Sequence, residues 1–310
     1  MPVLILGLWL MSGMSFGGLL YGHQKTKAQL ELPTPSKLKK DVAFWESIFR
    51  KYKSHQCVLH DSWDLSIVYD VANISHRSRK VQNRKIKKAR RRIVRLLKRF
   101  SKGHKPKKRW EKNVYRSVPY AQRNPRFFRK ALKRVRCQRG IADRFAHSLK
   151  RSKRHLSTIA KEIKRQELPV DLAYLPHLES GFNNRAHSKV GAKGLWQIMP
   201  KTGRKLFKRG RDHRTHVRKA TRFALGLLKR NYRKTKSWPL AVTAYNYGIN
   251  GTLRAIKKYN TRNYMVIRKR HKTRLFRFAA RNFYPSFLAV RNLADKHTPA
   301  PIKRRQRSKS

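Results

Sequence analysis

The chain has 310 residues, of which 39% are hydrophobic, so it is long enough for one sizeable core domain and a smaller appended segment. It contains 80 Lys and Arg but only 14 Asp and Glu. The formal net charge of +66 lies far outside the range of ordinary globular enzymes. Such a charge predicts an anionic partner. Composition alone leaves open nucleic acid, an anionic membrane or wall surface, and a source whose proteins are all basic.

The first segment, residues 1–28, predicts a signal peptide or a membrane anchor. It opens with a nearly unbroken run of apolar and small residues, and Thr26 and Ala28 supply the small side chains expected before a cut at Gln29. The run is at the lower limit for spanning a bilayer, so removal and retention both stay open. Residues 29–40 are polar, contain prolines and are expected to form a linker.

Residues 41–155 are expected to form a basic, mainly helical region with one small β-hairpin. Two short β-prone runs, 57–60 and 65–71, flank a polar turn. Cys57 and Cys137 are the only cysteines, and they lack both CxxC spacing and a nearby histidine pair, so no zinc site is expected. The two thiols could pair in an oxidising compartment or pack separately, and the sequence leaves both open.

The highest local charge lies in residues 77–112, where 19 of 36 positions are Lys or Arg. Four apolar residues recur there at helical spacing: Ile86, Ile93, Leu97 and Phe100. This pattern predicts a basic amphipathic helix followed by a loose basic loop. The helix could bind an anionic membrane or wall surface, or it could dock by its apolar stripe and present a solvated charged face.

From residue 113 onwards the pattern is helical, with few strand candidates. Apolar residues recur at three- and four-residue steps in three stretches: 172–178, 217–228 and 249–256. Three prolines stand where helices could begin: Pro169, Pro200 and Pro239. The expected fold class is therefore mainly α, with a second domain at residues 156–298 and a basic disordered tail at residues 299–310.

Between residues 168 and 203 the basic background stops. Glu179 follows an apolar helical stripe there and precedes Ser180 and Gly181, so we expect it at the end of a helix with one buried face. A carboxyl group in apolar surroundings has a raised pKa, because desolvation disfavours its charged form, and this suits a general acid. Positive neighbours would lower the same pKa, so burial must outweigh them at Glu179.

Three motifs follow one another along the chain: Glu179-Ser180-Gly181-Phe182, Gly194-Leu195-Trp196-Gln197-Ile198-Met199-Pro200 and Ala244-Tyr245-Asn246-Tyr247-Gly248. In this order, with Ser188, Gly191 and Ala192 also matching, they resemble the Glu-Ser, GLxQIMP and AYNxG blocks of the lytic transglycosylases. Among these the chain is most similar to the membrane-bound type D. The resemblance covers about residues 41–295 and implies a lysozyme-like transglycosylase domain at residues 156–298.

The resemblance implies a carbon–oxygen lyase that acts on peptidoglycan glycan strands. It would cleave the β-1,4 bond between N-acetylmuramic acid and N-acetylglucosamine and leave 1,6-anhydromuramic acid ends, with Glu179 as acid and then as base. Five residues would bind substrate: Ser188, Gln197, Met199, Tyr245 and Asn246. Ser180, Gly194 and Gly248 would have structural roles near the site. No cofactor and no metal are implied.

The closing helix departs from the family pattern. Many relatives carry Glu-Thr-Arg-x-Tyr-Val where this chain has Ala279-Ala280-Arg281-Asn282-Phe283-Tyr284. The acid is therefore missing, and an aromatic hydroxyl could come only from Tyr284, one position later. We expect the edge of the site near this helix to differ from that of the relatives.

Two other functions stay open: a hydrolytic muramidase on the same fold and a non-catalytic basic wall-binding protein. Hydrolytic glycosidases usually use two carboxylates, and the next acid after Glu179 is Asp212, which we expect to be structural. Nucleic acid is not expected as a partner, because aromatic residues are not interleaved with the basic residues of 77–112. The sequence does not indicate an oligomeric state. The resemblance and the amino-terminal segment together imply a periplasmic or cell-envelope location, with anchoring to the inner membrane as an alternative.

Overall fold

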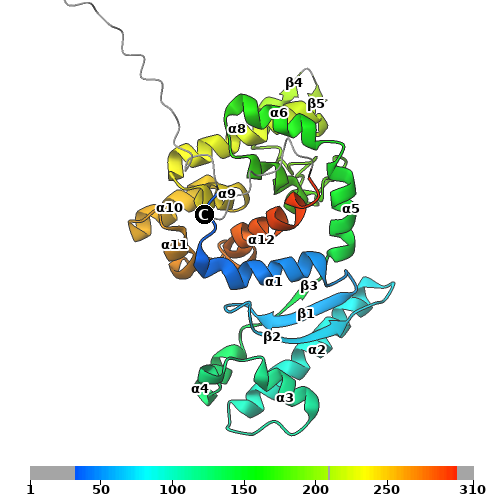
Figure 1. Ribbon diagram of the computed structural model, residues 1–310, viewed down its shortest axis with the longest axis vertical. Helices are drawn as coiled ribbons and strands as arrows, with labels where there is room; N and C mark the ends of the chain where they lie inside the picture. Colours follow the sequence, from blue (N-terminus) through cyan, green and yellow to red (C-terminus); the bar gives the residue numbers. More distant parts are fainter. Residues whose placement is uncertain (1–31, 209, 299–310) are drawn as a thin grey trace, which may run out of the picture.

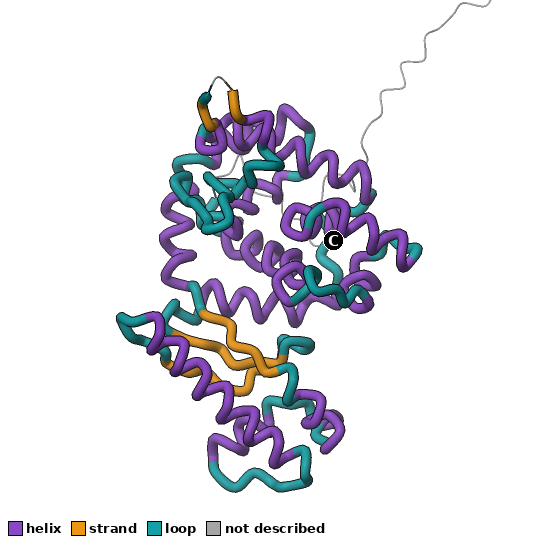
Figure 2. The backbone as a smooth tube through the Cα atoms, turned by 180° about the vertical axis from the view of Figure 1, so that it is seen from behind, coloured by secondary structure: helices purple, strands orange, loops and turns teal. Residues whose placement is uncertain are grey.

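The computed structural model describes residues 32–208 and 210–298 (Figure 1). A body of helices lies above a smaller lobe that contains a sheet and three helices. The tube view from behind shows the same two parts, with the sheet of the lobe between helices of the body and of the lobe (Figure 2). We call residues 56–139 the lobe and the remaining described residues the body. The prediction of a mainly α fold with a small β-hairpin is confirmed.

The sheet of the lobe has three antiparallel strands in the order β2-β1-β3. Their bounds are β1 (Gln56–Asp61), β2 (Val68–Asn73) and β3 (Val135–Arg139). The expectation of few strands after residue 113 missed β3, which is short and basic. It becomes a strand because it pairs with β1, and such tertiary pairing overrides weak local propensity.

Both faces of the sheet are buried, because helix α1 (Lys39–Arg50) covers one face and α2 (Arg79–Phe100) the other (Figure 1). Successive side chains of a strand point to opposite faces. Val58 therefore joins the hydrophobic core of the body, and Leu59 joins that of the lobe. His60 packs against two aromatic rings of the body and is fully buried. The central strand thus connects the two cores.

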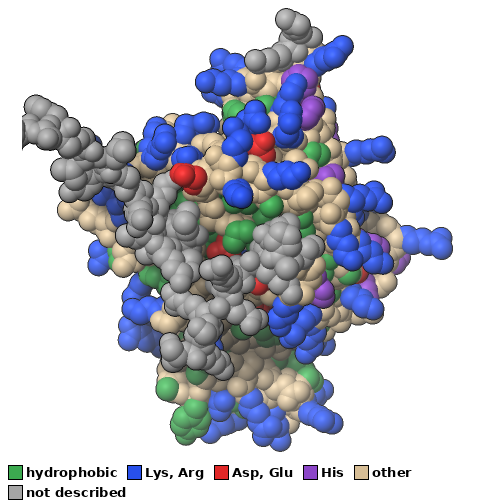
Figure 3. Space-filling model, turned by 45° about the horizontal axis from the view of Figure 1, so that its top comes forward, with side chains coloured by type: hydrophobic (Ala, Val, Ile, Leu, Met, Phe, Trp, Pro, Cys, Tyr) green, Lys and Arg blue, Asp and Glu red, His purple; other side chains and the backbone are tan. Residues whose placement is uncertain are grey.

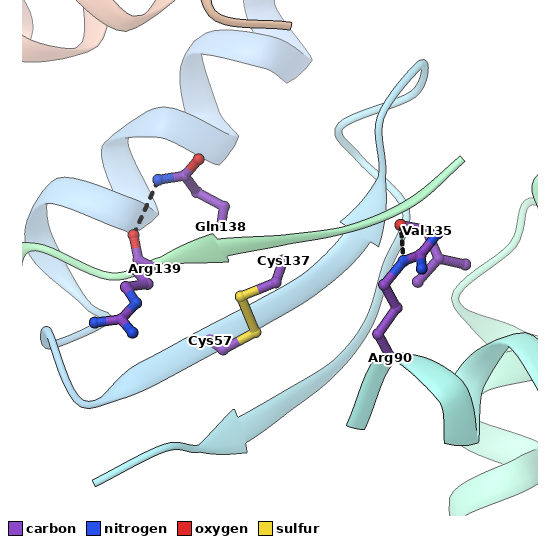
Figure 4. Close-up of a disulfide and its surroundings, with 6 residues drawn as sticks. All are labelled: Cys57, Arg90, Val135, Cys137, Gln138 and Arg139. Carbon is purple, nitrogen blue, oxygen red and sulfur yellow. Dashed lines mark hydrogen bonds between the residues drawn. A yellow bond between two sulfur atoms is a disulfide. The ribbon is translucent and has the colours of Figure 1, made fainter. Parts of the chain in front are cut away.

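Cys57 and Cys137 form a disulfide between β1 and β3, with their Cα atoms 5.6 Å apart (Figure 4). Cys57 is fully buried in the core of the lobe. The bond closes a loop with a sequence separation of 80, which contains β2 and the three lobe helices. Of the two states that the sequence left open, the structure has the paired one.

The predicted basic amphipathic helix is α2. Its apolar stripe packs under the sheet together with α3 (Arg109–Arg116) and α4 (Pro125–Ala131). Its fully buried residues are Ile93, Leu96, Leu97 and Phe100. The helix therefore docks by its apolar stripe and presents its basic residues on the outside. Binding of an anionic surface by residues 77–112 stays a prediction.

The body consists of α1 and the helices after the lobe. These are α5 (Ala142–Ser152), α6 (Leu156–Gln166), α7 (Leu175–Glu179), α8 (Val217–Thr235), α9 (Trp238–Tyr247), α10 (Ile249–Tyr259), α11 (Tyr264–Arg270) and α12 (Phe278–Asp295). Helix α12 lies in the middle and contacts α1, α7 and α9. Because α1 and α5 share one hydrophobic cluster with α7 to α9, they pack as part of the body. The predicted domain boundaries, including the one at residue 155, stay a prediction.

Helices begin at two of the three prolines where the sequence predicted a helix start. Pro169 precedes a 3₁₀ helix at Val170–Tyr174 that leads into α7, and Pro239 lies in the first turn of α9. Pro200 begins no helix, because the Gly203 N–H donates to the Met199 carbonyl and closes a turn there. A proline that fits a first helical turn also fits a turn, and the sequence does not separate the two.

The expected location needs a correction. The predicted periplasmic or cell-envelope location, with possible anchoring to the inner membrane, is not borne out. Across residues 32–208 and 210–298, no helix is long and apolar enough to cross a membrane. The apolar segment at residues 1–28 and the tail at residues 299–310 lie outside the described residues.

Candidate active site

Glu179 is the last residue of α7, as the sequence predicts. The N–H groups of Ser180 and Phe182 both donate to the Pro176 carbonyl and end the helix. Gly181 and Phe182 then adopt positive φ values of 59° and 56°, which turn the chain sharply after Glu179. Glycine adopts this conformation freely, and the fully buried Phe182 ring holds the second residue in it. The carboxyl group is thus fixed at a helix end.

Burial raises the pKa of Glu179 to about 8. The residue as a whole is half-buried by surface area, while protein atoms enclose its carboxyl group. Among the described residues, no Lys or Arg forms an ion pair with it, and no group donates a hydrogen bond to it. The high positive charge of the chain therefore does not reach this carboxyl group as a direct contact.

Helix α5 supports the Glu179 turn from beneath. His177 is buried, and its Nδ1 lies 2.6 Å from Ser148 Oγ. Burial, with a contribution from the Arg151 charge, lowers the pKa of His177 to about 3, so the ring is neutral. Arg151 donates two hydrogen bonds to the Gly181 carbonyl, at 2.9 and 2.7 Å. These contacts fix the backbone on both sides of Glu179.

Hydrogen bonds join the three sequence motifs into one site. The Ser180 hydroxyl donates to the Leu195 carbonyl at 2.8 Å, which links the first motif to the second. The Tyr245 hydroxyl donates to the Trp196 carbonyl at 2.7 Å, which links the third motif to the second. Burial and the charge of Glu179 both raise the pKa of Tyr245, so the two side chains are electrostatic neighbours.

Arg214 fixes the loop that carries the second motif, a role that the sequence analysis did not predict. Its Nη1 donates to the Gly191 carbonyl at 2.7 Å and to the Ile198 carbonyl at 2.9 Å, so one buried guanidinium fastens both ends of the loop. Gly194 has a φ of 79°, and a Cβ added there would lie 2.2 Å from the Arg214 carbonyl oxygen. Among so many Lys and Arg, no local signal marks this arginine.

Asp212 positions Arg214. Its carboxylate accepts hydrogen bonds from the Arg214 backbone N–H and side chain, and it forms a second ion pair with Lys193 at 3.1 Å. The Arg214 contacts, with the backbone bond and Lys193, hold the pKa of Asp212 far below its usual range. The carboxylate is engaged in loop structure, as expected for a residue without a catalytic role.

The predicted substrate-binding residues fall into three groups. Tyr245 is half-buried beside Glu179, whereas Met199, 38% exposed, and Asn246 face solvent. The Ser188 hydroxyl accepts from the Ala192 N–H at 2.9 Å, within its own loop. Gln197 has a φ of 44°, and its side chain donates to a loop carbonyl at 3.0 Å. Ser188 and Gln197 therefore shape the loop that carries the second motif.

Gly248 joins α9 to α10 with a φ of 93°, a value that disfavours any residue with a Cβ. Nothing lies within 4 Å of where its Cβ would be, so the backbone angle is the constraint there. The end of α9 therefore turns tightly next to Asn246.

The closing helix does not restore the missing hydroxyl. Tyr284 is fully buried, and its hydroxyl donates to the Pro33 carbonyl at 2.6 Å. Arg281 donates to the Ser62 carbonyl of the lobe at 2.9 Å. In this chain the start of α12 therefore holds the segment before α1 and the β1–β2 turn.

Figure 3 shows Lys and Arg spread over the visible face, with few Asp and Glu. Within residues 32–208 and 210–298, no cluster of three or more His, Cys, Asp or Glu side chains could hold a metal ion.

Comparison with known proteins agrees with this arrangement. Residues 157–267 match the Transglycosylase SLT domain family, and all three motifs lie within that segment. The chain is 36% identical over 116 residues to membrane-bound lytic murein transglycosylase D of Escherichia coli strain K12, a match that covers 36% of this chain and 26% of that protein. The chain thus spans about a quarter of that relative's length.

Two further proteins are similar to parts of the chain. An Alteromonas sp. strain M-1 protein named for tributyltin chloride resistance is 36% identical over 111 residues, which cover 34% of this chain and 53% of that protein. The X-ray structure of an inactive mutant of the lytic transglycosylase Slt from Pseudomonas aeruginosa superposes with a TM-score of 0.39 at 18% identity. That superposition covers 73% of this chain and 34% of the other.

Proposed function

We propose that the chain, whose residues 157–267 match the transglycosylase SLT domain family, cleaves peptidoglycan glycan strands as a lytic transglycosylase with Glu179 as its catalytic acid and base. The bond cut is the β-1,4 bond between N-acetylmuramic acid and N-acetylglucosamine. The product end is a 1,6-anhydromuramic acid.

One observation carries this proposal: burial raises the pKa of Glu179 to about 8, and no described cation opposes it by direct contact. A general acid must hold its proton at working pH, and an ordinary glutamic acid would have lost it. The raised pKa resolves the conflict between a protonated acid and a chain with a net charge of +66.

The proposed reaction uses one carboxyl group twice. Glu179 gives its proton to the glycosidic oxygen as the bond to the muramic acid C1 breaks, and the sugar's N-acetyl oxygen stabilises the cation at C1. The Glu179 carboxylate then takes the proton from the C6 hydroxyl as that oxygen bonds to C1. Glu179 ends the cycle protonated, and no water is consumed.

The surroundings of Glu179 fit a reaction with a single carboxylate. Asp212, the next acid along the chain, is committed to Arg214 and Lys193 and is not free to activate water. Tyr245 stands beside Glu179 with its hydroxyl donated to the Trp196 carbonyl. In the proposal Tyr245 and Ser180 hold the three motifs around the acid, while exposed Met199 and Asn246 contact the glycan.

Mass spectrometry of digested peptidoglycan sacculi tests the proposal. The chain should release anhydro-muropeptides, and Glu179→Gln should release none, because an amide cannot donate the proton. A matched control is Glu46→Gln, which removes a half-buried carboxylate on α1 that accepts from Asn292 and should leave the products unchanged. Reducing-end muropeptides would instead identify a hydrolase, and equal product from Glu179→Gln would remove Glu179 from the mechanism.

A further inference from the structure

A pocket lies where the lobe meets the body. Its volume is about 280 Å³, and it lies between the β1–β2 turn and the loop that joins α11 to α12. The turn contributes Trp63, the loop contributes His271, Lys272 and Phe276, and α12 contributes Arg281. The whole lobe lies outside the segment that matches the SLT family, so this pocket depends on a part of the chain that the family does not define.

The turn presents Trp63 as a fixed platform. Its N–H donates to the fully buried Asp61 carboxylate at 2.7 Å, and its carbonyl accepts from Arg281 at 3.3 Å. Asp61 is in turn paired with Arg134 at 3.0 Å. The Trp63 side chain is nevertheless 44% exposed, and no other tryptophan among the described residues is an exposed one. An exposed indole on a rigid turn is typical of a binding surface.

Two cations flank this indole. Lys272 Nζ lies 4.9 Å from the centre of the Trp63 ring, and the Arg281 guanidinium lies 4.7 Å from it. Lys272 is exposed and forms no ion pair within the described part of the chain, and the pocket lining contains no Asp or Glu. A planar ring beside an ammonium group that has no ion pair suits a sugar that carries a carboxylate.

The pocket is built against the third active-site motif. The Tyr247 hydroxyl lies 3.0 Å from His271 Nε2, and its ring packs 5.0 Å from that of Phe276. His271 is 6% exposed, and its Nδ1 has no hydrogen-bond partner among the described residues. Two lining residues of the pocket therefore pack against the end of α9.

The end of α9 separates the pocket from Glu179. Residues two positions apart on a helix face different sides, so Tyr245 reaches the Trp196 carbonyl while Tyr247 reaches His271. Exposed Asn246 lies between them in the sequence. A helix with its side chains is about 10–12 Å across, a width that a glycan strand of several sugars can cross.

We propose that the Trp63 pocket is a second subsite for the glycan strand, which binds a carboxylate-bearing sugar unit away from the bond that is cut. The apolar face of the sugar packs on Trp63, and Lys272 binds the carboxylate. This inference rests on the proposed function and adds the lobe to the substrate-binding surface. The carboxylate comes from the lactyl group of muramic acid or from its stem peptide.

Equilibrium binding by the full Glu179→Gln chain tests this without turnover. The probes are soluble glycan strands with stem peptides, strands freed of peptides by an amidase, which keep lactyl carboxylates, and uncharged N-acetylglucosamine oligomers. Trp63→Ala should weaken binding of all three probes by about tenfold, because each has a sugar face to stack. Lys272→Gln should weaken binding of carboxylate-bearing probes by about fivefold and leave the uncharged oligomers unchanged.

The three probes identify the source of the carboxylate. The lactyl carboxyl is an amide in peptide-bearing strands, so a loss on Lys272→Gln with peptide-free strands alone assigns the carboxylate to the lactyl group. A loss with peptide-bearing strands alone assigns it to the peptide, and a loss with both shows that Lys272 binds either carboxylate. Lys51→Gln is the matched control, because Lys51 Nζ also lies over an aromatic ring, at 5.5 Å from Tyr52, on the far end of α1. It should change no affinity.

Unchanged binding by both Trp63→Ala and Lys272→Gln would overturn the inference. If the unsubstituted chain still releases anhydro-muropeptides in that case, the proposed function stands without the subsite. If the pocket variants lose binding while the unsubstituted chain releases no anhydro product, the subsite stands and the proposed reaction fails.

Discussion

At the scale of single residues, the site depends on one carboxyl group that is kept from the charge around it. Glu179 ends a short helix whose preceding residues are buried, and desolvation alone accounts for its raised pKa. The sequence predicted both the helix end and the direction of this shift. Arg214 could not be predicted, because its importance lies in two carbonyl groups that only the folded loop brings within its reach.

The raised pKa of Glu179 predicts a dependence of stability on pH. Below about pH 4.5 the group is protonated in both states; between about 4.5 and 8 only the unfolded chain loses the proton, so ionisation favours unfolding. The free energy of unfolding should therefore fall across this window. Glu179→Gln has no ionisable group at this position. At pH 8 its free energy of unfolding should therefore exceed that of the unsubstituted chain by on the order of 1–3 kcal/mol. Denaturant titrations of both chains at pH 4.5 and pH 8 measure the two free energies of unfolding. A difference between the chains that is the same at both pH values would contradict the prediction.

Arg214→Gln should lower the free energy of unfolding by about 2–4 kcal/mol, because it leaves the Asp212 carboxylate and two loop carbonyls without their main partner. Activity should fall as well, since the loop positions the second motif. Arg211→Gln is the matched control, because Arg211 is an exposed neighbour on β5 (Arg211–Asp212), and it should change stability by less than about 0.5 kcal/mol. Similar losses in both variants would show that Arg214 has no special role.

At the scale of elements, long helices with a periodic apolar pattern were predictable from the sequence, whereas the pairing of distant segments was not. Helices α2, α8 and α10 follow from apolar residues at three- and four-residue steps. Strand β3 has no such signal, because a short basic strand is defined by its neighbour β1. The same limit applies to Tyr284, whose hydroxyl bonds to Pro33, a residue 251 positions away in the sequence.

The disulfide between β1 and β3 predicts that the lobe depends on oxidation. Closing a loop of about 80 residues restricts the unfolded chain and is worth about 4 kcal/mol in the loop-entropy description. Reduction should therefore lower the denaturant midpoint of the oxidised chain. The double variant Cys57→Ser with Cys137→Ser should show no response to reductant. An oxidised chain that is equally stable with and without reductant would show that the bond contributes nothing.

At the scale of the whole molecule, the net charge of +66 and the buried acid act at different ranges. Surface charges are largely screened beyond about 8 Å in physiological salt, whereas desolvation of Glu179 does not depend on salt. Stem peptides of peptidoglycan carry free carboxylates, so the Lys and Arg side chains are expected to act on binding. Composition predicted an anionic partner, but only the three motifs pointed to a glycan.

Raising the salt concentration should therefore weaken binding of the chain to peptidoglycan sacculi far more than it slows turnover of bound glycan. Co-sedimentation gives the first quantity, and single-turnover cleavage of bound sacculi gives the second. Equal salt effects on both would mean that the surface charge acts on the chemical step.

The central claim, that Glu179 acts as a protonated acid because it is buried, is tested most directly by the pH dependence of kcat/KM for release of anhydro-muropeptides. This quantity reports the pKa of groups in the free enzyme. The account predicts a rate that stays high through neutral pH and falls as pH rises through about 8. A fall that begins near pH 5, as for an ordinary glutamic acid, would contradict it.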